Sequence, residues 1–439
     1  MSSEWPMVRL GEHVEACLGK MLDAQKNKGT PQPYLGNSNV RWGQFDLTDL
    51  AEMRFEPHEE ERYSLLPGDL VVCEGGEPGR CAIWTGPAGM KVQKALHRIR
   101  PKETLDNYYL FYWFQQAAKA GLLEPYFTGT TIKHLTGKAL AALEVPLPAI
   151  EVQRAMVDVL KQLDDRITLL RETNATLEAI AKALFKSWFV DFDPVRAKMA
   201  GRAPEGMDEA TAALFPDALE ETELGLVPKV WRQRPVYETA EFINGAAYKA
   251  FNPNAERRGL PIIKIAELKA GVTSQTAYSD VEMPSKYLIE TADILFSWSG
   301  NPDTSIDTFV WPHDSAWLNQ HIFRVIPKKK NERAYLLQML RYLKPVFAEL
   351  ARNKQTTGLG HVTVADLKRQ TFVWPDGGVM RAFDEVVGQI QQRILTNEQQ
   401  AISLAVVRDT LLPRLISGQL RLPEAMAELD AASVDVDKS

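Results

Sequence analysis

The chain has 439 residues, enough for two or three domains, and 45% hydrophobic, 9% aromatic and 25% charged residues, the composition of a soluble globular protein. This balance excludes collagen-like, mucin-like, disordered and membrane-spanning classes, since no run of 18 apolar residues occurs. The net charge is −6, but residues 191–230 carry −5 and residues 422–439 carry −4, which leaves +3 for the rest. A polyanionic partner such as nucleic acid therefore stays open.

The first residues lack the basic and then apolar order of a signal peptide. The three cysteines, Cys17, Cys73 and Cys81, show no CxxC spacing and suit a reducing compartment. We therefore expect a cytoplasmic protein with no membrane partner.

The chain contains an internal repeat. Residues 154–167 align without gaps on residues 381–394, and six of the fourteen positions are identical. At the same offset of 227, His134 falls on His361, while earlier in the chain the offset is 226. The chain is therefore two copies of one unit, each with a mixed segment of about 140 residues followed by a long helix.

Within each mixed segment, short apolar runs after turn residues predict buried strands at 69–73 and 293–297, with partner strands at 82–85 and 307–311. Apolar residues at helical spacing predict helices at 107–120 and 332–350. Proline then favours extended chain at 145–148 and 373–376.

Each long helix carries a narrow apolar seam of coiled-coil type with one asparagine on it, a residue that specifies register at a cost in stability. Similar lengths and complementary seams favour an antiparallel pair, although two independent helices remain the alternative. The predicted packing positions are Val152, Met156, Val159, Leu163, Ile167, Leu170, Asn174, Leu177 and Leu184 in the first helix, and Phe383, Val386, Ile390, Ile394, Asn397, Leu404, Leu411 and Leu415 in the second.

These patterns predict an α+β fold with a pseudo-twofold internal repeat, in which two strand-rich mixed domains are joined by two long antiparallel helices. The predicted boundaries are 1–148 for the first mixed domain, 149–192 for the first helix, 193–229 for a linker, 230–376 for the second mixed domain, 377–420 for the second helix and 421–439 for an acidic tail.

Catalytic and metal-binding motifs are missing: the sequence has no GxxxxGK[ST] phosphate loop and no HExxH zinc motif. We therefore predict no catalytic residue, no metal site and no cofactor in this chain. His134 and His361 recur in threonine-rich segments, and either a structural or a DNA-facing role fits them.

Basic and amide side chains of the mixed segments are candidate contacts to phosphates and base edges. The predicted DNA-binding residues are Lys20, Lys26, Lys28, Arg41, Gln93, Lys94, Lys133 and His134 in the first copy, and Lys249, Arg257, Arg258, Lys269, Asn319, Gln320, Lys354, Gln355 and His361 in the second. For any one of them taken singly, a solvated surface position is the favoured alternative, and only the set as a whole suggests DNA binding.

The alternation of variable segments and repeated helices, together with residues 184–194, 224–231, 319–324 and 411–420, resembles the specificity subunits of type I restriction-modification systems. The resemblance covers nearly the whole chain. One departure is Gly388, which stands where the first helix has Lys161 and is expected to weaken the second helix locally.

The resemblance implies that the two mixed domains are target-recognition domains, each reading one half of an asymmetric, bipartite site in double-stranded DNA. The paired helices would set the gap between the halves and dock the modification subunits, two in number, which bind S-adenosylmethionine and methylate adenine. Restriction subunits would translocate and cut DNA with ATP and Mg. This chain would then be a non-catalytic reader.

Two other classes stay open from the sequence. One is a stand-alone nuclease or methyltransferase with a cryptic site, and the other is a coiled-coil adaptor that does not bind DNA. DNA cleavage or methylation by the chain alone would identify the first, and a salt-dependent DNA-binding assay with the assembled complex would separate the second.

Overall fold

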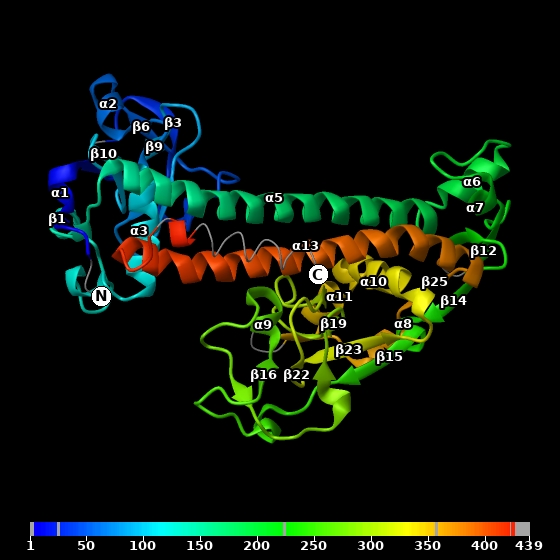
Figure 1. The fold of residues 1–439 in the computed structure, drawn as a ribbon. Helices are drawn as coiled ribbons and strands as arrows, with labels where there is room; N and C mark the ends of the chain where they lie inside the picture. Colours follow the sequence, from blue (N-terminus) through cyan, green and yellow to red (C-terminus); the bar gives the residue numbers. More distant parts are fainter. Residues whose placement is uncertain (1–3, 24–26, 223–224, 356–358, 422, 426–439) are drawn as a thin grey trace. The chain divides into compact units, whose positions relative to one another are not determined.

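The computed structural model describes residues 4–23, 27–222, 225–355, 359–421 and 423–425. The chain forms two compact units (Figure 1). The first unit consists of residues 1–167 and 403–439, and the second consists of residues 168–402. Within the described ranges, no helix has the length and hydropathy needed to cross a membrane.

The first unit is built on an antiparallel four-stranded sheet in the order β2 (Val14–Leu18), β10 (Leu96–Pro101), β7 (Leu70–Cys73) and β8 (Cys81–Ile83). A second sheet has the order β6 (Glu52–Phe55), β3 (Thr30–Leu35) and β9 (Lys91–Val92), with β3 parallel to β9. A third pairing joins β1 (Met7–Arg9) to β11 (Glu144–Pro146).

The second unit repeats this plan. Its antiparallel sheet has the order β15 (Ala240–Asn244), β23 (Ile322–Pro327), β19 (Ile294–Ser297) and β21 (Asp307–Val310). A second sheet has the order β17 (Tyr278–Ser279), β16 (Leu260–Ile263), β22 (Ala316–Leu318) and β18 (Leu288–Ile289), and β16 is parallel to β22. The third pairing joins β14 (Arg232–Pro235) to β25 (Thr371–Trp374). The predicted repeat is confirmed in the four-stranded sheet, in the parallel pair of the second sheet and in the third pairing, although the second sheet has three strands in the first unit and four in the second.

Shorter elements connect these strands. In the first unit they are α1 (Leu10–His13), η1 (Asn37–Asn39), β4 (Val40–Arg41), β5 (Gln44–Phe45), η2 (Pro57–Glu59), α2 (Glu60–Tyr63), α3 (Asn107–Lys119), η3 (Glu124–Tyr126) and α4 (Gly137–Ala141). In the second they are α8 (Val236–Thr239), η4 (Tyr248–Phe251), α9 (Ile265–Ala270), η5 (Ser285–Tyr287), β20 (Ser299–Gly300), η6 (Lys330–Glu332), α10 (Arg333–Tyr342), α11 (Lys344–Arg352), β24 (Gly360–His361) and α12 (Val364–Arg369).

The predicted helix at 107–120 is confirmed as α3, but the one at 332–350 is two helices, α10 and α11. The first ends at Tyr342, and Pro345 occupies the first turn of the second. Proline is well suited to a first turn and disfavoured in a helix interior, because it has no N–H to donate. Helical spacing alone does not reveal this break.

Two long helices contribute to both units, α5 (Ile150–Phe189) and α13 (Gly377–Ser417). In the second unit they are antiparallel, since Asn174 donates to the carbonyl of Ile394 at 3.0 Å while Phe185 contacts Phe383. In the first unit Arg408 pairs with Asp164 at 2.6 Å. The second helix continues through Gly388 without interruption.

Residues 193–229 were predicted to be a linker, and the structure corrects this. They form α6 (Asp193–Met199), α7 (Glu209–Ala213) and a hairpin of β12 (Leu219–Thr222) with β13 (Gly225–Pro228). Val195, Phe215 and Val227 of this segment are buried in the core of the second unit. The glycine and proline residues of this segment therefore lie within a folded region and do not mark a linker.

Candidate nucleic-acid interface

Three segments of the first unit meet where β7 ends and β10 begins. The backbone N–H of Glu74 donates to the carbonyl of Ala95 at 2.8 Å, and the N–H of Leu135 donates to the carbonyl of Glu74 at 2.7 Å. These bonds bring Gln93, Lys94 and His134 together, three residues that the sequence predicted separately. We call Glu74, Gln93, Lys94 and His134 the first rim.

The corresponding place in the second unit has the same backbone bonds. The N–H of Trp298 donates to the carbonyl of His321 at 3.3 Å, and the N–H of Val362 donates to the carbonyl of Trp298 at 2.8 Å. Here the structure gathers Trp298, Gln320, His321 and His361, which we call the second rim. The sequence predicted two of these four, Gln320 and His361.

A glycine holds each rim turn close to the sheet. A Cβ atom on Gly19 would lie 2.4 Å from the carbonyl oxygen of Gln93, and one on Gly245 would lie 2.2 Å from that of Asn319. No larger residue fits at either position, because such distances are far inside van der Waals contact. The close approach is therefore a repeated device that fixes where each rim lies.

The side chains of the second rim form an aromatic cluster. The ring of Trp298 lies 5.4 Å from that of His321 and 5.8 Å from that of His361, and its indole N–H donates to Asn244 Oδ1 at 2.9 Å. Burial and the proximity of His361 both lower the pKa of His321. The imidazoles and the amide of Gln320 offer hydrogen-bonding groups of the kind that match base edges.

Both histidines of the second rim keep an unused ring nitrogen. The Nδ1 atoms of His321 and His361 are buried and have no hydrogen-bond partner among the described residues. Buried polar atoms are normally paired, so these two ring nitrogens are unsatisfied in this structure. The first rim instead presents a carboxylate, an amide and an ammonium group, so the two rims differ chemically.

Lys20 was predicted to contact phosphate, and the structure contradicts this. Its side chain is 4% exposed, pairs with Glu59 at 2.5 Å and donates to the carbonyl of Arg54 at 2.8 Å. A buried, paired ammonium is unavailable to a phosphate. Lys28 is exposed, and Lys26 lies outside the described residues.

Lys133, another predicted phosphate contact, is 55% exposed and lies 3.9 Å from Glu124. This contact leaves the ammonium largely in solvent. His134 beside it is exposed, while its backbone pairs with that of Thr128.

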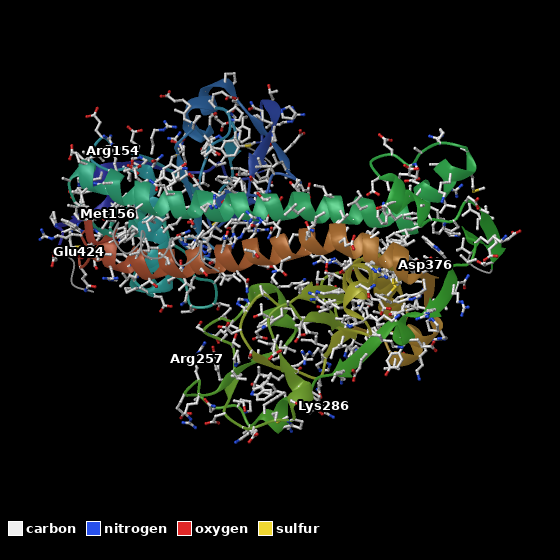
Figure 2. All side chains as sticks on the ribbon, turned by 45° about the vertical axis from the view of Figure 1, so that its right-hand side comes forward. Arg154, Met156, Arg257, Lys286, Asp376 and Glu424 are labelled. Atoms are coloured by element: carbon white, nitrogen blue, oxygen red, sulfur yellow. The ribbon has the colours of Figure 1, made fainter. Side chains whose placement is uncertain are left out.

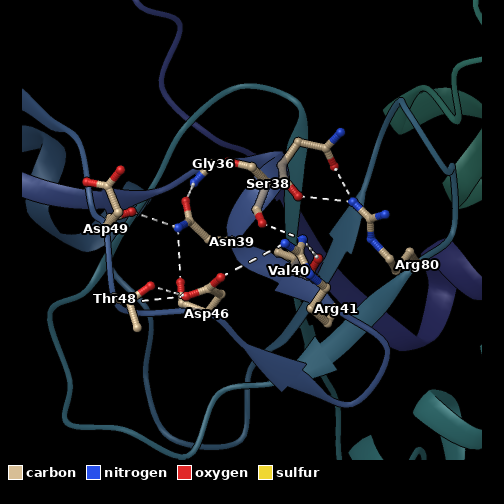
Figure 3. A network of polar contacts seen from close by, with 10 residues as sticks. Gly36, Ser38, Asn39, Val40, Arg41, Asp46, Thr48, Asp49 and Arg80 are labelled. Atoms are coloured by element: carbon tan, nitrogen blue, oxygen red, sulfur yellow. Dashed lines mark hydrogen bonds and ion pairs between the residues drawn. The ribbon is translucent and has the colours of Figure 1, made fainter. Parts of the chain in front are cut away.

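Arg41 belongs to a loop network that engages the Nη1 atom of its guanidinium (Figure 3). Its guanidinium donates to the carbonyls of Ser38 and Val40 and lies 4.0 Å from Asp46. The buried Asn39 closes the same loop by donating to the carbonyls of Asp46 and Asp49 at 3.0 and 3.1 Å. Arg41 thus holds the loop, and because its side chain is 48% exposed its phosphate contact stays a prediction.

Hydrogen bonds from Thr48, first from its side chain and then from its backbone N–H, hold the pKa of Asp46 below its usual range. The loop acceptor thus stays ionised beside Arg41.

The second unit engages most of its predicted cations internally. Arg257 donates to the carbonyls of Thr273 and Ser274 at 3.0 and 2.9 Å and lies over the ring of Tyr278. Figure 2 shows Arg257 and Lys286 on the strand-rich part of this unit. The structure thus assigns Arg257 to loop packing.

Three further cations of the second unit have acidic or carbonyl partners. Arg258 pairs with Asp280 at 2.9 Å, Lys269 donates to the carbonyl of Thr304, and Lys354 pairs with Asp366 at 2.5 Å. These partners compete with any phosphate.

Burial raises the pKa of Asp366, but hydrogen bonds from Lys354, Thr363 and Arg369 outweigh it and hold the pKa well below the usual range. The Lys354 pair therefore persists at any pH near neutrality.

Among the remaining predictions for the second unit, Lys249 and Gln355 are exposed, and Gln355 has a contact of its own. Asn319 is 4% exposed, so its side chain is not a surface reader as predicted. Its backbone bridges to Ala246 and supports the rim turn.

The structure brings the two predicted seam asparagines together. Asn397 is fully buried and donates to Asn174 Oδ1 at 2.9 Å. Of the predicted packing positions, all within the described helices, Val386 alone is exposed, at 48%. Val387 is buried in its place because it continues the i, i+4 row from Phe383.

The remaining predicted positions are buried or half-buried: Val152, Met156, Val159, Leu163, Ile167, Leu170, Leu177, Leu184, Ile390, Ile394, Leu404, Leu411 and Leu415.

Sequence reasoning missed Glu74, Trp298 and His321 as rim residues. The repeat contained the signal, because Glu74 and Trp298 each follow the buried strand of their own copy. His321 directly follows Gln320, which was predicted. Only the backbone bonds between distant segments show that these residues meet.

One group of described residues could approach a metal ion, namely Glu56, His58 and Glu59, whose ligand atoms lie within 4.8 Å of one another. Glu59 is already used, because it accepts from Lys20 and from the backbone N–H of Glu56. These contacts account for its position without an ion.

Residues 2–179 and 228–394 each match the family described as "Type I restriction modification DNA specificity domain". The chain belongs to this family. It is a specificity subunit of a type I restriction-modification system, and DNA recognition is the role of the family. The double match agrees with the repeat found in the sequence and in the sheets.

Relatives agree with this assignment. The chain is 24% identical over 364 residues to the type I restriction enzyme MjaIX specificity subunit of Methanocaldococcus jannaschii, with 81% of this chain and 78% of that protein covered. It is 26% identical over 338 residues to the HindI specificity subunit of Haemophilus influenzae, with 66% and 72% covered. The crystal structure of an S subunit from M. genitalium shares the fold, with a TM-score of 0.52, 16% identity and 94% and 96% coverage.

Proposed function

We propose that the two rims are the DNA-reading surfaces, that each reads one half of a bipartite site, and that the site is asymmetric. One observation carries this proposal. The rims have the same backbone bonds and the same restraining glycine, yet one presents Glu74 and Lys94 where the other presents Trp298 and Gln320. A conserved frame with exchanged polar groups suits two readers of different base pairs.

Single-residue changes in the rims test this assignment. We expect Trp298→Ala to relax the bases of one half-site and Glu74→Gln to relax those of the other, as mapped by single-molecule sequencing of methylated adenines. Each good contact to a base contributes about 1–3 kcal/mol of discrimination. Lys286→Ala, an exposed lysine outside both rims, is the control and should leave the site unchanged. Changes spread over both halves would contradict the proposal.

We further propose that the paired helices set the gap between the half-sites and dock two modification subunits. Both helices run without a break through residues of both units, which supports a fixed spacer. One heptad inserted after Asn174, together with one inserted before Asn397, keeps both seams in phase and lengthens both helices. The expected result is a longer unread gap in the methylated sites, and an unchanged gap would refute the spacer role.

The chemistry is proposed to lie in other subunits, with S-adenosylmethionine in the modification subunits and ATP with Mg in the restriction subunits. This chain would then be non-catalytic and would act in the cytoplasm. The small charge outside the acidic segments and the paired cations support weak DNA binding by the chain alone. Equal affinity of the isolated chain and the full complex at physiological salt would contradict this.

A further inference from the structure

The second unit contains a cavity of about 340 Å³ that the DNA-reading role does not use. It lies among α5, β21, α10 and the start of α11, and its aromatic walls are Phe185 and Tyr342. A volume of this size is within the range of small-molecule sites.

Two buried polar groups line this cavity without a partner. Gln338 is 3% exposed and Thr308 is 5% exposed, yet Gln338 Nε2 and Thr308 Oγ1 have no hydrogen-bond partner among the described residues. Buried polar atoms are paired in nearly all folded proteins. Two unpaired polar groups among the residues that line one cavity favour an occupant with hydrogen-bonding groups.

The charged residues of the cavity include one cation to spare. Arg341 pairs with Glu178 at 3.5 Å, and Lys344 pairs with Asp307. Lys182 also lines the cavity and has no ion pair within the described part of the chain. The lining therefore carries an excess charge of +1.

Two further groups face this cluster from the long helices. Burial, and then the proximity of Glu178, raise the pKa of Glu398 on α13, while Arg341 and Arg171 act in the opposite direction. Glu398 and Arg171 add one charge of each sign. The positive excess therefore stands.

The first unit carries larger side chains at two corresponding positions. Tyr109 and Tyr335 fix the register, since each donates its hydroxyl to a backbone carbonyl near the end of its mixed segment. By this register Tyr112 stands where the second unit has Gln338, and its hydroxyl donates to Asp164 at 2.7 Å.

Asp164 in turn pairs with Arg408, and in the repeat Ala181 occupies the place of Arg408. Replacing a tyrosine by glutamine and an arginine by alanine removes side-chain volume and leaves unused donors. The second unit therefore carries the smaller side chains at these two positions, which leaves room for the cavity.

We propose that this cavity binds a small molecule that joins an oxyanion to a flat apolar body. The ammonium of Lys182 and the amide N–H groups of Gln338 donate but do not accept, so the bound group must accept hydrogen bonds and carry negative charge. Phosphate and carboxylate share this chemistry. The apolar body lies against Phe185 and Tyr342.

Isothermal titration calorimetry of the full chain with phenyl phosphate tests the assignment. Inorganic phosphate lacks the apolar body and phenol lacks the charge, so both should bind at least tenfold more weakly. Benzoate distinguishes a carboxylate site from a phosphate site, and stronger binding of either anion identifies which one the site takes.

Variants locate the binding. Lys182→Ala and Gln338→Leu should each weaken phenyl phosphate binding at least tenfold, whereas Lys286→Ala, which removes an exposed lysine outside the cavity, should have no effect. Gln338→Tyr, which imports the residue of the first unit, should abolish binding.

The proposal would be overturned by no binding of phenyl phosphate or benzoate, by equal binding of phenol, or by binding that Lys182→Ala leaves intact. Thr308→Val removes the hydroxyl at nearly constant volume and keeps the test valid if the Gln338 variants fail to fold. Displacement of phenyl phosphate by duplex DNA would also overturn it, because the site would then hold a backbone phosphate.

Discussion

The two units repeat one fold but stabilise it with different side chains. Tyr109 and Tyr335 make equivalent hydrogen bonds, to the carbonyls of Pro146 and Val373. Trp84 and Trp311 likewise donate their indole N–H to a carbonyl three residues further on. Both units thus keep the same hydrogen bond at positions where a buried side-chain donor needs an acceptor.

The long helices differ between the units where they enter the core. The second unit uses Phe185, Trp188, Phe189 and Phe383, whose rings contact one another at centroid distances of 4.9–6.1 Å. The first unit has Leu412, Leu415, Ile416 and Met156 at the equivalent positions. The apolar period is therefore what the fold requires, and side-chain shape varies within it.

The largest expected effect compares the two cores. Phe383→Ala should lower the free energy of unfolding by about 3–5 kcal/mol, because it empties the centre of the aromatic cluster. Met156→Ala, the matched change in the first unit, should cost about 2–4 kcal/mol, since flexible aliphatic neighbours collapse more readily. Urea denaturation measures both.

Val386→Ala on the exposed face of the same helix is the control and should stay within about 0.5 kcal/mol. A loss below about 1 kcal/mol for Phe383→Ala would mean that the aromatic cluster repacks.

A second comparison concerns the polar contacts between the long helices. Asn397→Ala should cost about 1–3 kcal/mol, because it leaves Oδ1 of Asn174 without its donor. In the first unit the analogous polar contact is the Asp164–Arg408 pair. Arg408→Ala leaves the half-buried carboxylate of Asp164 without its cationic partner. Chemical denaturation of both variants gives the two costs.

Replacing both asparagines by leucine should restore stability or raise it while loosening the helix register. A double variant as unstable as Asn397→Ala would show that the seam needs an amide for packing rather than for pairing.

A third, smaller effect concerns exposed cations. Lys28→Ala in the first unit and Lys249→Ala in the second should weaken DNA binding by the complex equally for all sequences and reduce its salt slope by about 1 each. Lys20→Ala should instead act on stability, since that ammonium is buried on Glu59. Fluorescence anisotropy at several salt concentrations separates these outcomes, and a sequence-dependent loss for Lys28→Ala would contradict a phosphate contact.

The smallest expected effect is a shallow pH dependence of stability. Burial lowers the pKa of His97, His313 and His321, so their folded-state pKa values lie below the unfolded value. The unfolded chain then binds more protons as pH falls below about 6.5, and stability is lost from that pH downward.

His321→Gln removes the contribution of His321 to this pH dependence. The free energy of unfolding should then fall less steeply between pH 6.5 and the lower pKa of the folded state, as measured by denaturation at fixed pH steps. An unchanged decline would place the effect in His97, at the first sheet, or in His313.

Much of the architecture could be predicted from the sequence because it rests on local periodicity. The apolar seams, the turn residues before β7 and β19 and the asparagine on each helix are all readable within a few turns or strands. The internal repeat further indicated that the two halves of the chain share one fold, since similar sequences adopt similar folds. Only a one-residue error, Val386 for Val387, entered the seam.

The reading surfaces depended on contacts between distant residues. Lys20 and Lys28 look alike in the sequence, but only Lys20 meets Glu59, 39 positions away, and becomes buried. The rim formed by Trp298, His321 and His361 likewise exists only through bonds between three separate segments. Composition alone predicted a linker at 193–229, although its apolar residues complete a core.

The sequence by itself thus determined the repeated frame, the long helices and the family, because each follows from a periodic pattern or a motif. The tertiary structure decided which cations remain exposed, which side chains gather at each rim and where the second unit leaves a cavity. These depend on charge pairing and packing across the fold, and a side chain's availability is set by neighbours that its local sequence does not contain.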